Sequence, residues 1–217
     1  MSAFLGPIHH WLFNKVLIFE DLETVVVRKL EKEFKEDISK IYEEQKKKYG
    51  APFEKGVNLE TAIQHDNIHG WLQQRIEIAE TRQAAFIAKV IDKYKEEAKA
   101  VLKEIHREHG RKMGEQAKEK ESTGTAEEVY QVLNDNILDG MPCDQVNNVV
   151  ENRQDYLRWD VTNCLHRRYW EAVKADVQFF YVLRGLWIGS FVKGLNKGFD
   201  YKMELKDGKI VNEIIAK

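Results

Sequence analysis

The sequence predicts an α+β fold that is mainly helical, with a duplicated long-helix N-terminal half and a C-terminal part that holds a small antiparallel sheet and packed helices. Three observations favour this fold class. Residues 8–49 contain neither proline nor glycine and carry apolar residues at helical spacing. A motif in this stretch returns sixty positions later. Near the end of the chain, alternating apolar and polar residues flank Asp207-Gly208, the strongest short signal for a β-hairpin.

The composition indicates a folded protein and names no charged partner. Its 217 residues are 43% hydrophobic and 11% aromatic, enough for one sizeable core. With 34 basic and 36 acidic residues the formal net charge is -2, which disfavours nucleic acid as a partner. Two cysteines without a basic leader segment favour a cytoplasmic protein. Residues 177–195 are long enough to span a membrane but contain Arg184, so we expect a buried helix and no membrane contact.

The N-terminal half contains an internal duplication. The motif Ile-His-His-Trp-Leu at residues 8–12 returns as Ile-His-Gly-Trp-Leu at residues 68–72. The same offset continues beyond the motif and pairs Glu20 with Glu80. Similarity at one fixed offset is the signature of a repeated structural unit, so we interpret this half as a tandem duplication.

The predicted organisation follows from this duplication and from a change in composition. The region 1–118 holds the two repeats, at about 6–56 and 66–116. Residues 119–125 belong to the least apolar stretch of the chain and are predicted to be a linker. Residues 126–217 form the α+β region, which ends in the β-hairpin.

Local signals place the helices of the duplicated region. Pro7 suits the first turn of a helix, where its missing N–H would have no partner in any case. An unbroken helix over residues 8–49 would measure about 60 Å at 1.5 Å per residue, which favours two helices or one bent helix. Gly50 ends it, because glycine commonly caps a helix C-terminus. The second long helix is expected to begin near Asn58 or Thr61.

The C-terminal region mixes helices and strands. Thr125 and Glu128 have the spacing of a capping box, which predicts a helix over residues 125–138. Residues 157–161 alternate between apolar and polar, as a half-buried strand does. The other predicted elements are a helical piece at 143–152, helices at 167–175 and 176–195, and hairpin strands at 199–206 and 210–215. The sheet should therefore have at least three strands.

Both copies of the repeat place a histidine and a glutamate on one apolar helical face. At 100° per residue, His9 and Glu20 share a stripe, and so do His69 and Glu80. Two such helices packed antiparallel about a twofold axis would set His9 against Glu80 and His69 against Glu20. These pairs would fix the helix register or form a metal or proton-transfer site. Histidines that face away from the core are the third alternative.

A second group of candidates follows the predicted strand. Cys164 and His166 lie two residues apart, a spacing at which a thiol could act as a nucleophile beside a base. Together with Cys143 they could instead form a metal site, and free cysteine is also a common core residue. Arg184 lies in an apolar predicted helix, where it needs a carboxylate from this chain or from an anionic ligand.

Three stretches, within roughly residues 90–217, carry a resemblance to a known family. They are Tyr-Lys-Glu-Glu-Ala at 94–98 leading to His-Gly-Arg-Lys-Met-Gly at 109–114, Trp-Asp-Val-Thr-Asn-Cys at 159–164, and residues 191–199 leading into the hairpin. In these stretches the chain resembles the L-2-amino-thiazoline-4-carboxylic acid hydrolase-like family of bacterial proteins. The resemblance implies a ring-opening hydrolase for a C–N bond of a small cyclic amino-acid-like compound, with Cys164 matching the family's strand-end cysteine.

The chain departs from the family pattern in two places. The family carries further cysteine and aspartate residues in the helix after this cysteine and a cysteine in the last strand. Here those regions read Phe-Phe-Tyr-Val-Leu-Arg at 179–184 and Val-Asn-Glu at 211–213. If the missing residues are needed for hydrolysis, the chain is a relative that has another role.

The leading hypothesis is a small-molecule hydrolase, or a non-catalytic relative that binds a similar ligand. Cys164 would be the nucleophile, His166 the base or its orienter, and Arg184 the anchor for a substrate carboxylate. One alternative is a metal- or cofactor-binding helical protein whose ligands are drawn from His9, His69, Glu20, Glu80 and Cys143. Another is a helical oligomerisation module without chemistry. We expect a small-molecule ligand and allow for a homodimer, and no particular cofactor is indicated.

Overall fold

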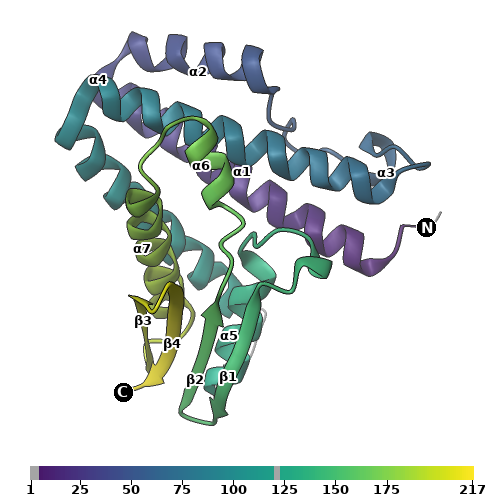
Figure 1. Ribbon diagram of the computed structural model, residues 1–217, viewed down its shortest axis with the longest axis vertical. Coiled ribbons are helices and arrows are strands. Elements are labelled where there is room, and N and C mark those ends of the chain that lie inside the picture. Colours follow the sequence, from purple (N-terminus) through teal and green to yellow (C-terminus); the bar gives the residue numbers. More distant parts are fainter. Residues whose placement is uncertain (1–4, 120–122) are drawn as a thin grey trace. The chain divides into compact units, whose positions relative to one another are not determined.

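The computed structural model describes residues 5–119 and 123–217, which form a mainly helical α+β protein with a four-stranded antiparallel sheet (Figure 1). Residues 120–122 of the predicted linker lie outside the described residues. The helices and strands are α1 (Pro7–Phe34), α2 (Glu36–Tyr49), α3 (Leu59–Ala62), α4 (Ile68–Lys118), α5 (Ala126–Asn136), the 3₁₀ turn η1 (Pro142–Asp144), β1 (Asn147–Arg153), β2 (Tyr156–Val161), α6 (Arg167–Ala172), α7 (Val177–Leu195), β3 (Phe199–Lys206) and β4 (Lys209–Ala216).

The chain divides into two compact units that interleave along the sequence. The first unit consists of Met1–Ala98, Ile137–Asp144 and His166–Asp176. The second consists of Lys99–Asn136, Gln145–Leu165 and Val177–Lys217. Helix α4 contributes its first part to one unit and its last part to the other.

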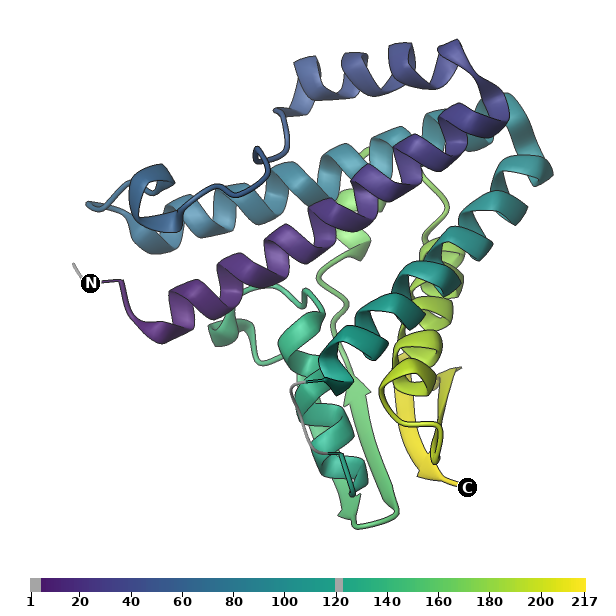
Figure 2. The same cartoon turned by 180° about the vertical axis from the view of Figure 1, so that it is seen from behind.

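In the first unit α1 and the first part of α4, the leading helices of the two copies, pack parallel and in register. His9 Nε2 lies 3.1 Å from His69 Nε2 near the start of α1 and α4. At the other end, the rings of Phe34 and Tyr94 stack with centroids 4.1 Å apart. Both pairs join equivalent positions, and Figures 1 and 2 show the two helices side by side. The expected antiparallel arrangement, with His9 against Glu80 and His69 against Glu20, is therefore wrong.

The parallel arrangement has a simple cause in the chain path. Helix α2 runs back along α1, so the second copy begins near the end of the molecule where the first copy began (Figure 1). The turn before α2 is made at Lys35, which has φ 61° and ψ -144°. The equivalent Lys95 has φ 50° and ψ -127° and interrupts α4. The break at Lys35 confirms that residues 8–49 form two helices instead of one, and Lys95 repeats this break in the second copy.

The second long helix begins later than its pattern suggested. Asn58 does cap a helix, since its side-chain oxygen accepts the N–H of Glu60 at 2.8 Å. This helix, α3, ends at Ala62 because Ile63 is extended, with φ -82° and ψ 149°. Helix α4 starts only at Ile68. The apolar core at this end of the unit joins α1, α3 and α4 with Leu138 and Met141.

The second unit contains the sheet, in the strand order β1-β2-β4-β3. The hairpin is confirmed, with Lys206 paired to Lys209 and positive φ angles at Asp207 and Gly208. The helical piece expected at 143–152 is wrong, because only η1 is helical there and β1 begins at Asn147. The β-branched Val149 and Val150 favour the strand, in which Val149 pairs with Trp159 of β2.

Helices α5 and α7 complete the second unit. The capping box of α5 is confirmed, because Thr125 Oγ1 accepts the N–H of Glu128 at 3.2 Å and Glu128 Oε2 accepts the N–H of Thr125 at 3.0 Å. The late part of α4 crosses α7 at glycines, where a Cβ on Gly114 would lie 2.1 Å from the Phe191 carbonyl oxygen. In the described part of the chain, no helix combines the length and the apolar character needed to cross a bilayer.

Candidate acid–base site

A buried histidine lies between two carboxylates in the first unit. His166 immediately precedes α6, Glu80 is on α4, and Asp139 lies in the segment after α5. His166 Nδ1 is 2.6 Å from Glu80 Oε1, and its Nε2 is 3.4 Å from Asp139 Oδ1. The side chains of His166 and Glu80 are only 5% and 1% exposed, and that of Asp139 is 16% exposed. Three separate segments of the chain thus meet at one imidazole.

The two distances give the ring nitrogens different roles. The short contact to Glu80 is that of a charge-assisted hydrogen bond, so Nδ1 carries a proton and donates it. The contact to Asp139 is longer than a good N–H···O bond. Nε2, which lies beside Asp139, is therefore the nitrogen at which a proton can be exchanged, while Glu80 holds the ring in place.

The two oxygens of the Glu80 carboxylate have different surroundings. Its Oε2 is buried and has no hydrogen-bond partner in the described part of the chain. A buried carboxylate oxygen without a partner is costly, and such a group in a native protein is bonded by a water or a ligand or serves a catalytic role. The unpartnered oxygen lies on the same carboxyl group that orients His166, which supports a functional reading of this site.

The equivalent glutamate of the first copy has different partners. Glu20 Oε1 accepts a hydrogen bond from Arg82 at 2.9 Å, and Glu20 Oε2 accepts the N–H of Phe53 at 2.8 Å. Arg82 also forms a paired contact with Glu23, with a shortest distance of 2.6 Å, in a fully buried position. Burial raises the pKa of Glu23, and the hydrogen bonds from Arg82 oppose that rise. With Arg75 Nη2 3.6 Å from Glu20 Oε1, two arginines of α4 face two glutamates of α1, and the network joins these helices.

The two motif histidines form a separate pair. His9 Nδ1 accepts the N–H of Gly6 at 2.9 Å, so in the neutral ring the proton is on Nε2. That proton can be donated to His69 Nε2, 3.1 Å away. Burial and the neighbouring His69 lower the pKa of His9, which favours this neutral pair. A metal on Nε2 would have to displace the proton and break the helix cap, so the donor set does not suit a ligand pair.

The residues predicted as metal ligands are thus distributed over three clusters. His9 contacts His69, Glu20 contacts Arg82, and Glu80 contacts His166. Within residues 5–119 and 123–217, no group of three or more His, Cys, Asp or Glu side chains is arranged to hold a metal ion. The duplicated stripe consequently divides into a histidine pair, an ion-pair network and an acid–base site.

The remaining candidates belong to different units. Cys143 is exposed and lies in η1. It belongs to the first unit, as does His166. Cys164 is half-buried at the end of the segment that follows β2, in the second unit. Arg184 is half-buried on α7, also in the second unit. The structure therefore assigns the predicted nucleophile and the predicted base to separate compact units, although they are two residues apart in the chain.

The sequence indicated only part of this site. It identified His166 as a base or orienter and Glu80 as the buried partner of a histidine, but it assigned Glu80 to His9. Asp139 was missed, because Asp139-Gly140 has the character of an ordinary turn. Comparison of the chain with family models, with curated proteins and with solved structures found no match.

Proposed function

We propose that the chain is a small-molecule hydrolase in which His166 is the general base. The observation that supports this proposal is the 2.6 Å contact between the buried His166 Nδ1 and Glu80 Oε1. A carboxylate at this position fixes the imidazole tautomer and stabilises the imidazolium that forms when Nε2 takes up a proton. The substrate class, a cyclic amino-acid-like compound opened at a C–N bond, rests on the family resemblance over residues 90–217.

The proposed reaction adds water across the C–N bond. His166 Nε2 takes a proton from the attacking water as its oxygen bonds to the carbon. The electron pair of the breaking bond goes to the nitrogen, which receives the proton back from His166.

The test is the ring opening of L-2-amino-thiazoline-4-carboxylic acid by the purified protein, compared among variants. His166→Ala and Glu80→Gln should each lower kcat by about 10²- to 10⁴-fold, the usual contribution of a positioned acid–base group. Glu77→Gln is the matched control, because Glu77 lies one turn earlier on α4 with an exposed side chain. Equal activity of the His166→Ala variant and the wild type would rule out His166 as the base.

A non-catalytic relative is the second candidate, favoured by the departures at residues 179–184 and 211–213. In that case the wild-type protein should bind the same compound without opening its ring. Isothermal titration calorimetry, with chromatography of the recovered ligand, separates the two functions. Saturable binding with intact ligand supports the non-catalytic relative, whereas ring-opened product supports the hydrolase.

A further inference from the structure

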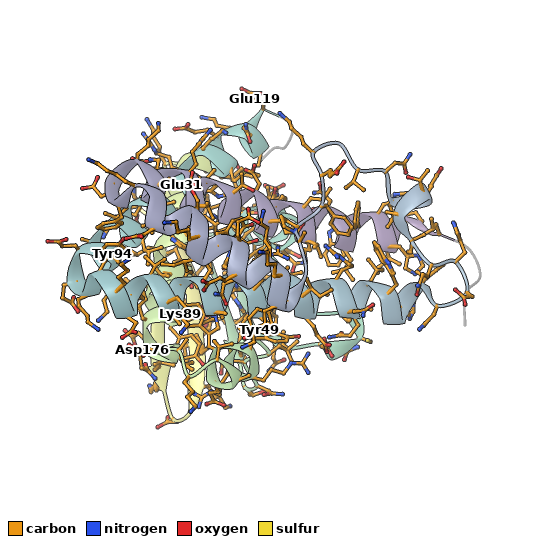
Figure 3. The ribbon with its side chains drawn as sticks, turned by 90° about the horizontal axis from the view of Figure 1, so that it is seen from above. Glu31, Tyr49, Lys89, Tyr94, Glu119 and Asp176 are labelled. Atoms are coloured by element: carbon orange, nitrogen blue, oxygen red, sulfur yellow. The ribbon has the colours of Figure 1, made fainter. Side chains whose placement is uncertain are left out.

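The first unit contains a pocket at some distance from His166. Its volume is about 440 Å³, within the usual range for small-molecule sites. The end of α2, the middle of α4 and the end of α6 line it, with residues Gln45, Lys48, Tyr49, Ala85, Ala88, Lys89, Asp92, Ala172, Val173 and Lys174. Figure 3 shows Tyr49 and Lys89 near each other on one side of α4.

The pocket lining combines three lysines with a smaller apolar part. Three exposed lysines line it: Lys48 on α2, Lys89 on α4 and Lys174, two residues beyond the end of α6. Asp92 is the acidic residue of the lining, and its Oδ1 already contacts Lys95 Nζ at 3.0 Å. The pocket therefore has a positive potential that would favour an anion.

The apolar part of the lining comes from small side chains and one aromatic ring. Ala85 and Ala88 lie on α4, and Ala172 and Val173 lie at the end of α6. Tyr49 adds its ring, and Lys48 Nζ stands 4.9 Å from the centre of that ring. Small side chains leave room for a flat group, and an aromatic ring next to them offers it a stacking surface.

We propose that this pocket binds a phosphate monoester that carries an aromatic or heterocyclic ring. Three ammonium groups are point charges that suit a dianionic phosphate better than a single carboxylate. The lining contains no arginine, the residue that recognises carboxylates through two parallel hydrogen bonds. The ring of the ligand would lie on Ala85, Ala88 and Tyr49 while its phosphate meets the lysines.

This site is separate from the proposed catalytic one. His166 and Ala172 are six residues apart, about 9 Å along a helix such as α6. None of the residues Glu80, Asp139 and His166 lines the pocket. The proposal therefore does not depend on hydrolase activity, and the His166→Ala variant should retain the binding.

The test is isothermal titration calorimetry of the purified chain with phenyl phosphate at low ionic strength. Phenyl phosphate should bind saturably, and at least about tenfold more tightly than inorganic phosphate, because the ring is removed from water. Lys48→Ala and Lys174→Ala should each weaken binding about three- to tenfold. Lys47→Ala is the matched control, because Lys47 is exposed on α2 next to Lys48 but does not line the pocket.

A neutral substitution tests the apolar part without changing charge. Ala88→Leu should remove the advantage of phenyl phosphate over inorganic phosphate by filling the space for the ring, while circular dichroism confirms that the variant is folded. The proposal is overturned if phenyl phosphate does not bind saturably, if Lys47→Ala weakens binding as much as Lys48→Ala, or if inorganic phosphate binds equally well.

Discussion

At the scale of single residues, duplicated positions have taken on different tasks. Glu20 and Glu80 are equivalent in the repeat, yet Glu20 neutralises Arg82 and Glu80 holds His166. The sequence could show that both glutamates lie on an apolar helical face, because periodicity reveals direction. It could not show the partner of either, because a partner such as His166 comes from a distant segment of the chain.

A second residue-scale feature is His106, which makes folding stability depend on pH. Burial lowers the pKa of His106 from 6.5 to about 4, and its Nδ1 donates to the Leu102 carbonyl at 2.7 Å. The imidazole of His106 therefore binds a proton near pH 6.5 in the unfolded chain but only near pH 4 in the folded chain. The stability contributed by the neutral ring is fully present above pH 6.5 and is lost as the pH falls toward 4.

The expected loss for His106 across that window is on the order of 3 kcal/mol in the free energy of unfolding. Urea denaturation at a series of pH values measures it. His106→Gln should flatten this part of the profile, because the glutamine side chain does not titrate. A His106→Gln profile as steep as that of the wild type would contradict the assignment.

At the scale of elements, the local patterns that were strong in sequence gave the correct structures. The capping box at Thr125 and the Asp207-Gly208 turn each specify their geometry through neighbouring residues alone. The start of the long second helix near Asn58 or Thr61 and the helical piece at 143–152 were wrong, although Asn58 does cap the short helix α3. There the outcome depended on an interruption at Ile63 and on pairing of β1 with β2, both of which involve tertiary context.

The crossing of α4 and α7 gives the element-scale prediction. A methyl group at Gly114 would lie 2.1 Å from the Phe191 carbonyl oxygen, so the two helices would have to separate. Gly114→Ala should lower the free energy of unfolding by about 1–3 kcal/mol, the usual cost of overpacking.

Gly189→Ala is the matched control for this crossing. A Cβ there would lie 3.5 Å from Tyr201 Cδ1, an ordinary contact, and alanine favours the helix. Chemical denaturation should therefore show a stability for Gly189→Ala equal to or above that of the wild type. Similar stability losses for Gly114→Ala and Gly189→Ala would show that the close crossing is not what constrains Gly114.

At the scale of the whole molecule, the mainly helical α+β class followed from composition and periodicity, whereas the two interleaved units did not. Segments 137–144 and 166–176 return to the unit formed by the N-terminal helices. These two segments carry Asp139 and His166, so the candidate site exists only because of this return. The sequence contains no signal for this return, because neither segment has an apolar pattern that indicates which helices it packs against.

The central claim is that Glu80 holds the His166 ring with Nδ1 protonated, so that Nε2 acts as the base. The most direct measurement is ¹⁵N NMR of the histidine rings in labelled protein at neutral pH. We predict that His166 Nδ1 bears a strongly hydrogen-bonded proton, which gives a downfield ¹H signal. This signal should be lost in the Glu80→Gln variant and kept in the control variant Glu77→Gln. A His166 signal with Nδ1 unprotonated, or one unaffected by Glu80→Gln, would contradict the account.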